Sequence, residues 1–215
     1  MKRASVKKLV LLAMLAAMAY IIVSVIRIPV VLFLKYEPKD VVITIGGFLL
    51  GPMAAFIVSL VVSLLEMVTI SETGPIGCLM NLISTCAFSC TAAALYKRKH
   101  TLGGAISGLV IGSAFMIVVM LLWNWLITPL YMGVDRSAVE GMLLPVFLPF
   151  NALKAGLNSA LVMLLYKPMS TGLRKTGLLE SSQSKASGSK LGFYLLAAGL
   201  LITCIILLLV MQGKI

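Results

Sequence analysis

A series of long apolar segments is the feature that most limits how this chain can fold. Such segments are expected at 6–28, 53–69, 76–96, 102–131, 143–166 and 191–211, with a shorter one at 41–50. A helix needs about 20 consecutive apolar residues to cross the hydrocarbon core of a bilayer. Hydrophobic residues make up 60% of the chain and charged residues 12%, which excludes an ordinary soluble domain. We therefore predict an all-α membrane protein with seven helices.

These helices are expected to form a six-helix unit and one additional helix. Gly51 and Pro52 separate the segment 41–50 from the next long segment, which indicates a tight turn between a short and a long helix. Residues 170–190 are rich in Ser, Gly and Lys, a composition typical of flexible linkers. The predicted units are a membrane bundle at 1–169, a cytoplasmic linker at 170–190 and a further transmembrane helix at 191–215.

Basic residues determine the expected orientation in the membrane. The formal net charge is +11, and most Lys and Arg residues fall on the side of the N-terminus. The opposite side carries Arg27, Lys35, Lys39, Arg136 and Lys214. Because basic residues accumulate in cytoplasmic loops, we predict a multi-pass protein of the cell membrane with its N-terminus in the cytoplasm and its C-terminus outside. This distribution accounts for the charge without nucleic acid, which we exclude as a partner.

The sequence contains no pattern typical of an enzyme or a metalloprotein. It lacks the Gly-rich phosphate loop of ATPases, a Ser–His constellation and an H-E-x-x-H motif. Its one histidine, His100, lies in a basic loop, and its four cysteines lie in or beside apolar segments, where they act as small packing residues. We expect no catalytic residues, no metal and no cofactor. If the chain moves a ligand uphill, the energy must come from a partner or an ion gradient.

A few polar side chains interrupt the apolar segments at one depth of the membrane. Asn124, Thr128 and Tyr131 share a face of the helix expected at 102–131 through their i, i+4, i+7 spacing. Asn151 and Lys154 share a face of the helix expected at 143–166, which runs in the opposite direction. Polar groups in hydrocarbon are costly and usually face a cavity or a partner. Together with Glu66 and Asn81, these residues predict a binding pocket in the outer half of the bilayer.

The residue types around this pocket indicate a small, polar and planar ligand. Amides supply both donors and acceptors, and ring contacts are expected from Trp123, Trp125, Tyr131 and Phe150. Two alternatives stay open: the asparagines bond neighbouring helices, or Glu66 and Lys154 form an ion pair. The charged segment 27–40 either covers the pocket as a lid or is a solvated loop.

Ala13 and Ala17 form a small-xxx-small pair on the first helix. Such a face lets another helix approach closely. It serves either a partner protein or packing within this chain.

Several separate stretches resemble a known family. These are 34–40, 45–52, 74–77 with Asn81, 124–131 and 148–154. Together they resemble the riboflavin-specific substrate-binding (S) components of energy-coupling factor (ECF) transporters, over about residues 5–168. The resemblance implies a six-helix bundle that binds the vitamin from outside, and partners consisting of a transmembrane coupling protein (T component) and two cytoplasmic ATPases.

The resemblance also assigns roles to residues. It implies that Asn124, Asn151 and Lys154 contact riboflavin, that Ala13 and Ala17 engage the coupling protein, and that the loop around Tyr36 and the region Gly77 to Asn81 close the site. The full set of expected ligand-binding residues is Tyr36, Asp40, Glu66, Gly77, Leu79, Asn81, Asn124, Thr128, Tyr131, Asn151 and Lys154.

The chain departs from the family pattern after residue 168. The linker and the seventh helix have no counterpart in six helices, so we expect binding to survive deletion of 180–215. Residues 41–44 also lack the proline expected after the loop aspartate. The alternatives that stay open are FMN as ligand, an S component for another vitamin, a secondary transporter working alone and an intramembrane enzyme.

Overall fold

The computed structural model describes residues 2–175 and 190–214. Its elements are α1 (Lys2–Val25), β1 (Ile28–Val31), β2 (Leu34–Tyr36), α2 (Lys39–Leu50), α3 (Pro52–Thr69), α4 (Gly74–Thr85), α5 (Thr91–Arg98), α6 (Leu102–Met132), α7 (Arg136–Met142), α8 (Leu148–Lys175) and α9 (Lys190–Met211). Two π-helical segments, Cys86–Cys90 and Leu143–Phe147, join α4 to α5 and α7 to α8. Among the described residues, six helical stretches are long and apolar enough to cross a membrane. The prediction of an all-α membrane bundle is confirmed.

The short helix α2 lies at the centre of the bundle. Its 12 residues span about 18 Å, less than the thickness of the hydrocarbon core. It packs against α1, α3 and α8, and all its residues from Lys39 to Phe48 are buried. As predicted, a tight turn follows: Gly51 has a φ of 96°, which favours glycine, and Pro52 begins α3.

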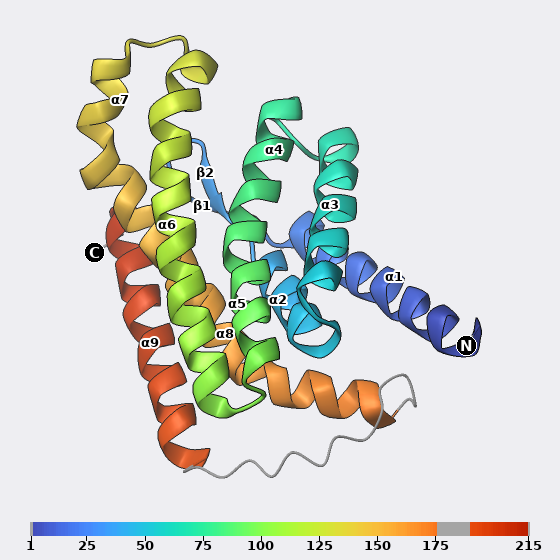
Figure 1. Cartoon of the computed structure of the whole chain (residues 1–215). Coiled ribbons are helices and arrows are strands. Elements are labelled where there is room, and N and C mark those ends of the chain that lie inside the picture. The colour runs from blue at the N-terminus through green and yellow to red at the C-terminus, as the bar shows by residue number, and fades with distance from the viewer. Residues whose placement is uncertain (1, 176–189, 215) are drawn as a thin grey trace.

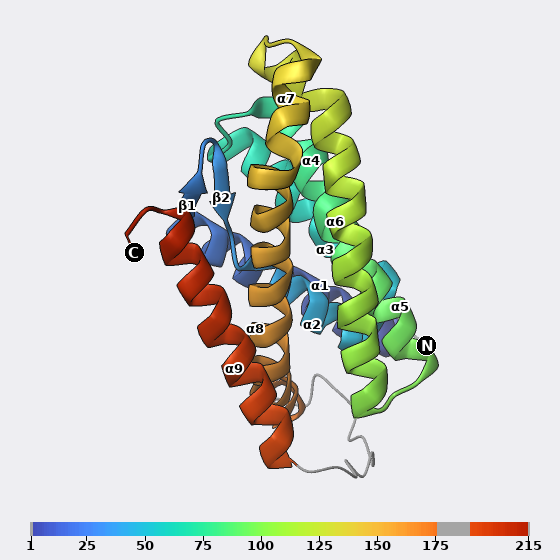
Figure 2. The same cartoon turned by 90° about the vertical axis from the view of Figure 1, so that its left-hand side faces the viewer.

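The other helices stand around α2 in the arrangement of Figures 1 and 2. Helices α6, α8 and α9 lie together on one side, α3 and α4 on the other, and α1 crosses the bundle at a slant. Helix α6 packs closely on the α4–α5 segment because it presents glycine there. A Cβ on Gly112 would lie 2.7 Å from the carbonyl oxygen of Phe88, and one on Gly108 would lie 2.8 Å from that of Ala92. The two backbones therefore touch.

The segment expected as a lid or a solvated loop folds into a β-hairpin. Strands β1 and β2 pair antiparallel, with Ile28 opposite Tyr36. The tip contains Leu32 with a φ of 51°, a conformation that L-residues adopt only in tight turns. In Figure 2 the hairpin stands between the bundle and the C-terminal end of α9.

Two predicted boundaries differ from the structure. The helical stretch expected at 143–166 begins at Arg136, since α7 and the second π-helical segment continue into α8. Helix α8 then runs to Lys175, six residues into the predicted linker. Pro168 does not end α8, and the last turns run across the bottom of the molecule in Figure 1, as expected of a proline-kinked helix. The rest of the predicted linker, 176–189, lies outside the described residues.

Candidate ligand-binding site

A cavity lies beneath the hairpin, between α4, α6 and α8. About 70 Å³ of it is open to the centre of a water-sized sphere. The lining combines charged and amide side chains with aromatic and aliphatic ones. These residues are Arg27, Phe33, Leu34, Lys35, Glu37, Glu72, Thr73, Met80, Asn81, Ser84, Met120, Asn124, Phe150, Asn151 and Lys154.

Three of the predicted amides line this cavity in fixed orientations. The Asn124 side chain donates to the carbonyl of Met120 at 2.7 Å and accepts from the Thr128 hydroxyl at 2.9 Å. Asn151 donates to the carbonyl of Phe147 at 2.8 Å. Because an amide has two N–H donors and a carbonyl oxygen, each keeps hydrogen-bonding capacity for a bound molecule.

Lys154 lines the cavity from α8 and is paired with Asp40. Its ammonium nitrogen lies 3.3 Å from Asp40 Oδ2 and donates a long hydrogen bond of 3.4 Å to Ser84. Asp40 is fully buried at the start of α2 and also accepts from Thr85 at 2.7 Å and from Asn158 at 3.3 Å. The proposed Glu66–Lys154 ion pair is therefore wrong, because Asp40 is nearer to Lys154 and Glu66 has another partner.

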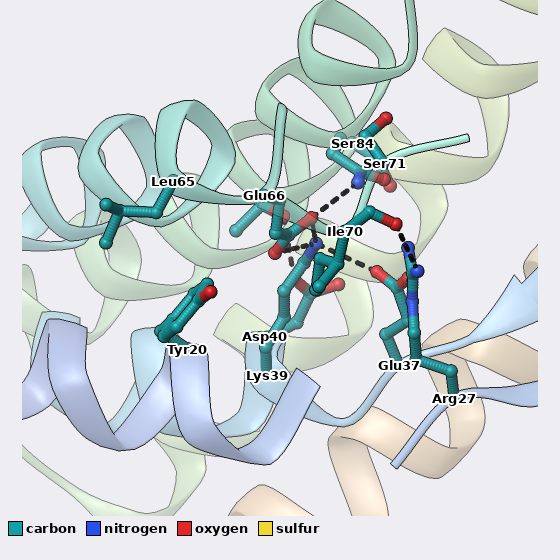
Figure 3. A network of polar contacts seen from close by, with 12 residues as sticks. Tyr20, Arg27, Glu37, Lys39, Asp40, Leu65, Glu66, Ile70, Ser71 and Ser84 are labelled. Atoms are coloured by element: carbon teal, nitrogen blue, oxygen red, sulfur yellow. Dashed lines mark hydrogen bonds and ion pairs between the residues drawn. The ribbon is translucent and has the colours of Figure 1, made fainter. Parts of the chain in front are cut away.

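That partner is Lys39, which is only 1% exposed although the sequence placed it among the outer loop charges. It donates to Glu66 at 2.6 Å and to Glu37 at 2.8 Å (Figure 3). Arg27 completes the group by donating to Glu37 at 2.9 Å and to the carbonyl of Ile70 at 2.8 Å. The sequence prediction did not assign this partner. A buried carboxylate such as Glu66 needs a cation nearby, and a lysine at the start of an apolar helix can supply it.

We call Arg27, Glu37, Lys39, Asp40, Glu66 and Lys154 the charge cluster. It contains three cations and three anions, so it is formally neutral. Burial alone would raise the pKa of Glu37, but Lys39 and Arg27 outweigh that effect and hold the pKa below its ordinary value.

Glu66 does not line the cavity, but it orients a residue that does. Its carboxylate accepts a hydrogen bond of 2.9 Å from the amide nitrogen of Asn81. The carbonyl oxygen of Asn81 and its second N–H are therefore left for a ligand. Lys39 thus acts on the cavity wall through Glu66 and Asn81.

A small apolar pocket of about 20 Å³ extends the cavity. Gly77, Thr128 and Tyr131 line it with Trp123, and Phe33, Thr73 and Met80 line both spaces. The rings of Phe33 and Tyr131 meet edge to face at 5.7 Å. Gly77, Thr128 and Tyr131, which were predicted as site residues, therefore lie beside the main cavity and not in its wall.

Other predicted residues lie away from both spaces. Leu79 is 51% exposed and lines neither. Tyr36 is buried and donates to Asn158 at 3.1 Å, and burial raises the pKa of its phenol. Trp125 donates to Glu140 at 2.9 Å, with the Arg136 guanidinium 5.0 Å from its ring centre, so the ring contact expected from it is wrong.

An exposed ion pair lies at the mouth of the cavity. Lys35 of β2 donates to both carboxylate oxygens of Glu72, at 2.7 and 2.8 Å. These hydrogen bonds lower the pKa of Glu72. The pair connects the hairpin to the loop between α3 and α4.

The alanine pair on α1 lies on the surface of the molecule. Ala13 and Ala17 are exposed, whereas Ala16 and Ala19 are buried against the bundle. Packing within the described chain therefore uses the second pair and leaves the first uncovered.

Comparisons with known proteins place this architecture in a family. The family model described as "ECF transporter, substrate-specific component" matches residues 7–166. The chain is 29% identical to riboflavin transporter RibU of Staphylococcus aureus (strain TCH60), over 79% of this chain and 93% of that protein. It is 27% identical to riboflavin transporter FmnP of Bacillus subtilis (strain 168), over 75% and 90% of the two chains.

A solved structure agrees. The S component of a bacterial ECF transporter matches with a TM-score of 0.67 and 30% identity, covering 79% of this chain and 99% of that one. These relatives are transport components rather than enzymes. The resemblance found in the sequence is confirmed: the chain belongs to the substrate-specific components of ECF transporters.

Proposed function

We propose that this chain binds riboflavin from outside the cell and delivers it inward, driven by ATP hydrolysis in partner subunits. The observation that carries the proposal is the cavity wall, where Asn81, Asn124, Asn151 and Lys154 present oriented polar groups beside aromatic rings. The names of two relatives, both riboflavin transporters, support the choice of ligand.

The chemistry of the cavity suits a flavin ring. Isoalloxazine carries an imide, in which two carbonyls flank an N–H, beside a flat apolar ring system. Lys154 supplies a donor for a carbonyl, and the Asn151 and Asn81 carbonyl oxygens supply acceptors for the N–H. Phe33 and Phe150 provide ring faces on the same wall.

The transport step requires partners. The sequence lacks an ATPase phosphate loop, and Ala13 and Ala17 offer an exposed small-residue face. We propose that a T component docks on this face and couples the chain to two cytoplasmic ATPases. In this arrangement the N-terminus lies in the cytoplasm and the cavity opens outward.

The deciding experiment is a riboflavin titration of the purified protein in detergent, followed by quenching of flavin and tryptophan fluorescence. We expect saturable one-to-one binding of riboflavin and none of thiamine or biotin. Selective binding of another vitamin, or no response in folded protein that carries no co-purified flavin, would reject the ligand assignment.

FMN is a second candidate ligand because Arg27 and Lys35 lie at the cavity wall. A phosphate there would have to compete with Glu37 and Glu72, which hold these two cations. The same titration with FMN decides: affinity equal to that of riboflavin supports FMN as a natural ligand, and much weaker binding excludes it.

The energy source has its own test. Uptake that stops in cells lacking the ATPases supports the proposal. Uptake that continues without them and collapses with the ion gradient would instead favour a secondary transporter.

A further inference from the structure

Helix α9 lies beyond the part of the chain that the family explains. The family model ends at residue 166, and the chain covers 99% of the solved S component with only 79% of its own length. The relatives therefore give α9 no role.

Helix α9 packs directly against α8. A Cβ on Gly156 of α8 would lie 2.5 Å from the sulfur of Cys204, so the glycine is what lets the two helices approach. Ala197 and Cys204 are buried in this contact. The opposite face of α9 carries exposed apolar side chains, including Ile202 and Ile206, as expected for a helix that faces lipid.

The C-terminal end of α9 reaches the hairpin. Gln212 donates a hydrogen bond of 2.6 Å to the carbonyl of Pro29 in β1. This hydrogen bond is exposed. An apolar cluster also joins three parts of the molecule. It includes Val30, Leu34 and Tyr36 of the hairpin, Leu153 and Leu157 of α8, and Leu200, Leu201, Leu207, Leu208 and Met211 of α9.

The hairpin needs support of this kind. A two-stranded hairpin is at best marginally stable on its own, and these strands have four and three residues. One side of the hairpin borders the cavity through Phe33, Leu34 and Lys35. The other side contacts α9, whose C-terminal end lies beside the hairpin in Figure 2.

We propose that α9 is a positioning helix, which holds the hairpin over the cavity and thereby slows ligand exchange. Its effect on the ligand rests on the proposed function, whereas its effect on the hairpin does not. Phe33, Leu34 and Phe150 belong both to this apolar cluster and to the cavity wall. A change in α9 packing therefore reaches the ligand site through these side chains.

The test uses the full chain with one substitution on α9 and one just after its end. Gln212→Met keeps the length of the side chain but removes the donor to Pro29, and Leu208→Ala removes part of the apolar support. The matched control is Ile206→Ala, a truncation of an exposed residue on the same helix. The two measurements are amide hydrogen exchange of residues 27–37 without ligand, and the dissociation rate of riboflavin.

In the double variant we expect hairpin amides to exchange about tenfold faster, the size expected from losing a hydrogen bond and buried contacts. Riboflavin should dissociate faster by a similar factor, and the control should match the native protein in both. Unchanged hairpin exchange in the folded double variant would overturn the proposal. Faster hairpin exchange with an unchanged dissociation rate would also overturn it.

The two measurements distinguish failure of this proposal from failure of the proposed function. If the native protein does not bind riboflavin, the hydrogen-exchange measurement still reports whether α9 holds the hairpin. If the double variant does not fold, Gln212→Met alone tests the same contact with a smaller expected change.

Discussion

Lys39 neutralises two carboxylates, because Glu37 and Glu66 share its ammonium group. Replacing it in Lys39→Met leaves buried Glu66 without a cation. Removing one partner of a buried ion pair costs about 3–5 kcal/mol. We expect a clear loss of thermal stability in detergent. Lys35→Met, which removes an exposed pair with Glu72, is the control and should leave the melting temperature nearly unchanged; equal effects in both variants would contradict the assignment.

A second residue-scale prediction concerns the cavity wall. Asn151→Ala removes the acceptor assigned to the ligand and should weaken riboflavin binding by about 1–3 kcal/mol, since ligand polar atoms stay unpaired. Trp125→Phe is the control, because that ring faces Glu140 and lies outside the cavity. Isothermal titration of both variants checks this. Native affinity in folded Asn151→Ala would remove Asn151 from the site.

At the scale of the element, α1 has a buried face that packs on the bundle and an exposed face that we expect to bind a partner. Ala13→Trp or Ala17→Trp should spare riboflavin binding and abolish uptake, because a bulky side chain prevents close approach of a partner helix. Ile111→Trp, on an exposed face of α6, is the control and should leave both intact. Uptake assays in cells and titration of the purified variants separate the two effects. Loss of binding in the alanine variants would show that this face serves the fold itself.

The helices themselves could be predicted well from sequence, and the hairpin could not. Apolar length and the Gly51–Pro52 pair are local signals, so they located α2 and α3 closely. Strands β1 and β2 are short, and their stability depends on contacts with α8 and α9 that no local pattern contains. The same holds for the end of α8, where Pro168 kinks the helix rather than stopping it.

At the scale of the whole molecule, helical periodicity brought Asn124, Asn151 and Lys154 to one cavity as predicted. Helical periodicity could not predict which carboxylate pairs with Lys154. The choice between Asp40 and Glu66 depends on the position of α2 in the bundle. Lys39 was missed for the same reason: its position near a helix start resembles that of an ordinary interfacial lysine. The charge cluster is neutral, so the net charge of +11 lies entirely outside it.

The amides of the wall differ from the charge cluster in how they are anchored. Asn124 and Asn151 bond the carbonyls of Met120 and Phe147, one turn back in their own helices. Members of the cluster are instead held by side chains from other elements. A mutation at Asn124 or Asn151 therefore leaves no distant partner without a hydrogen bond. A mutation in the charge cluster leaves a buried charge unpaired unless its partner is also replaced. Under the proposed function, substitutions at these two asparagines therefore change ligand preference while leaving the ion pairs of the charge cluster intact.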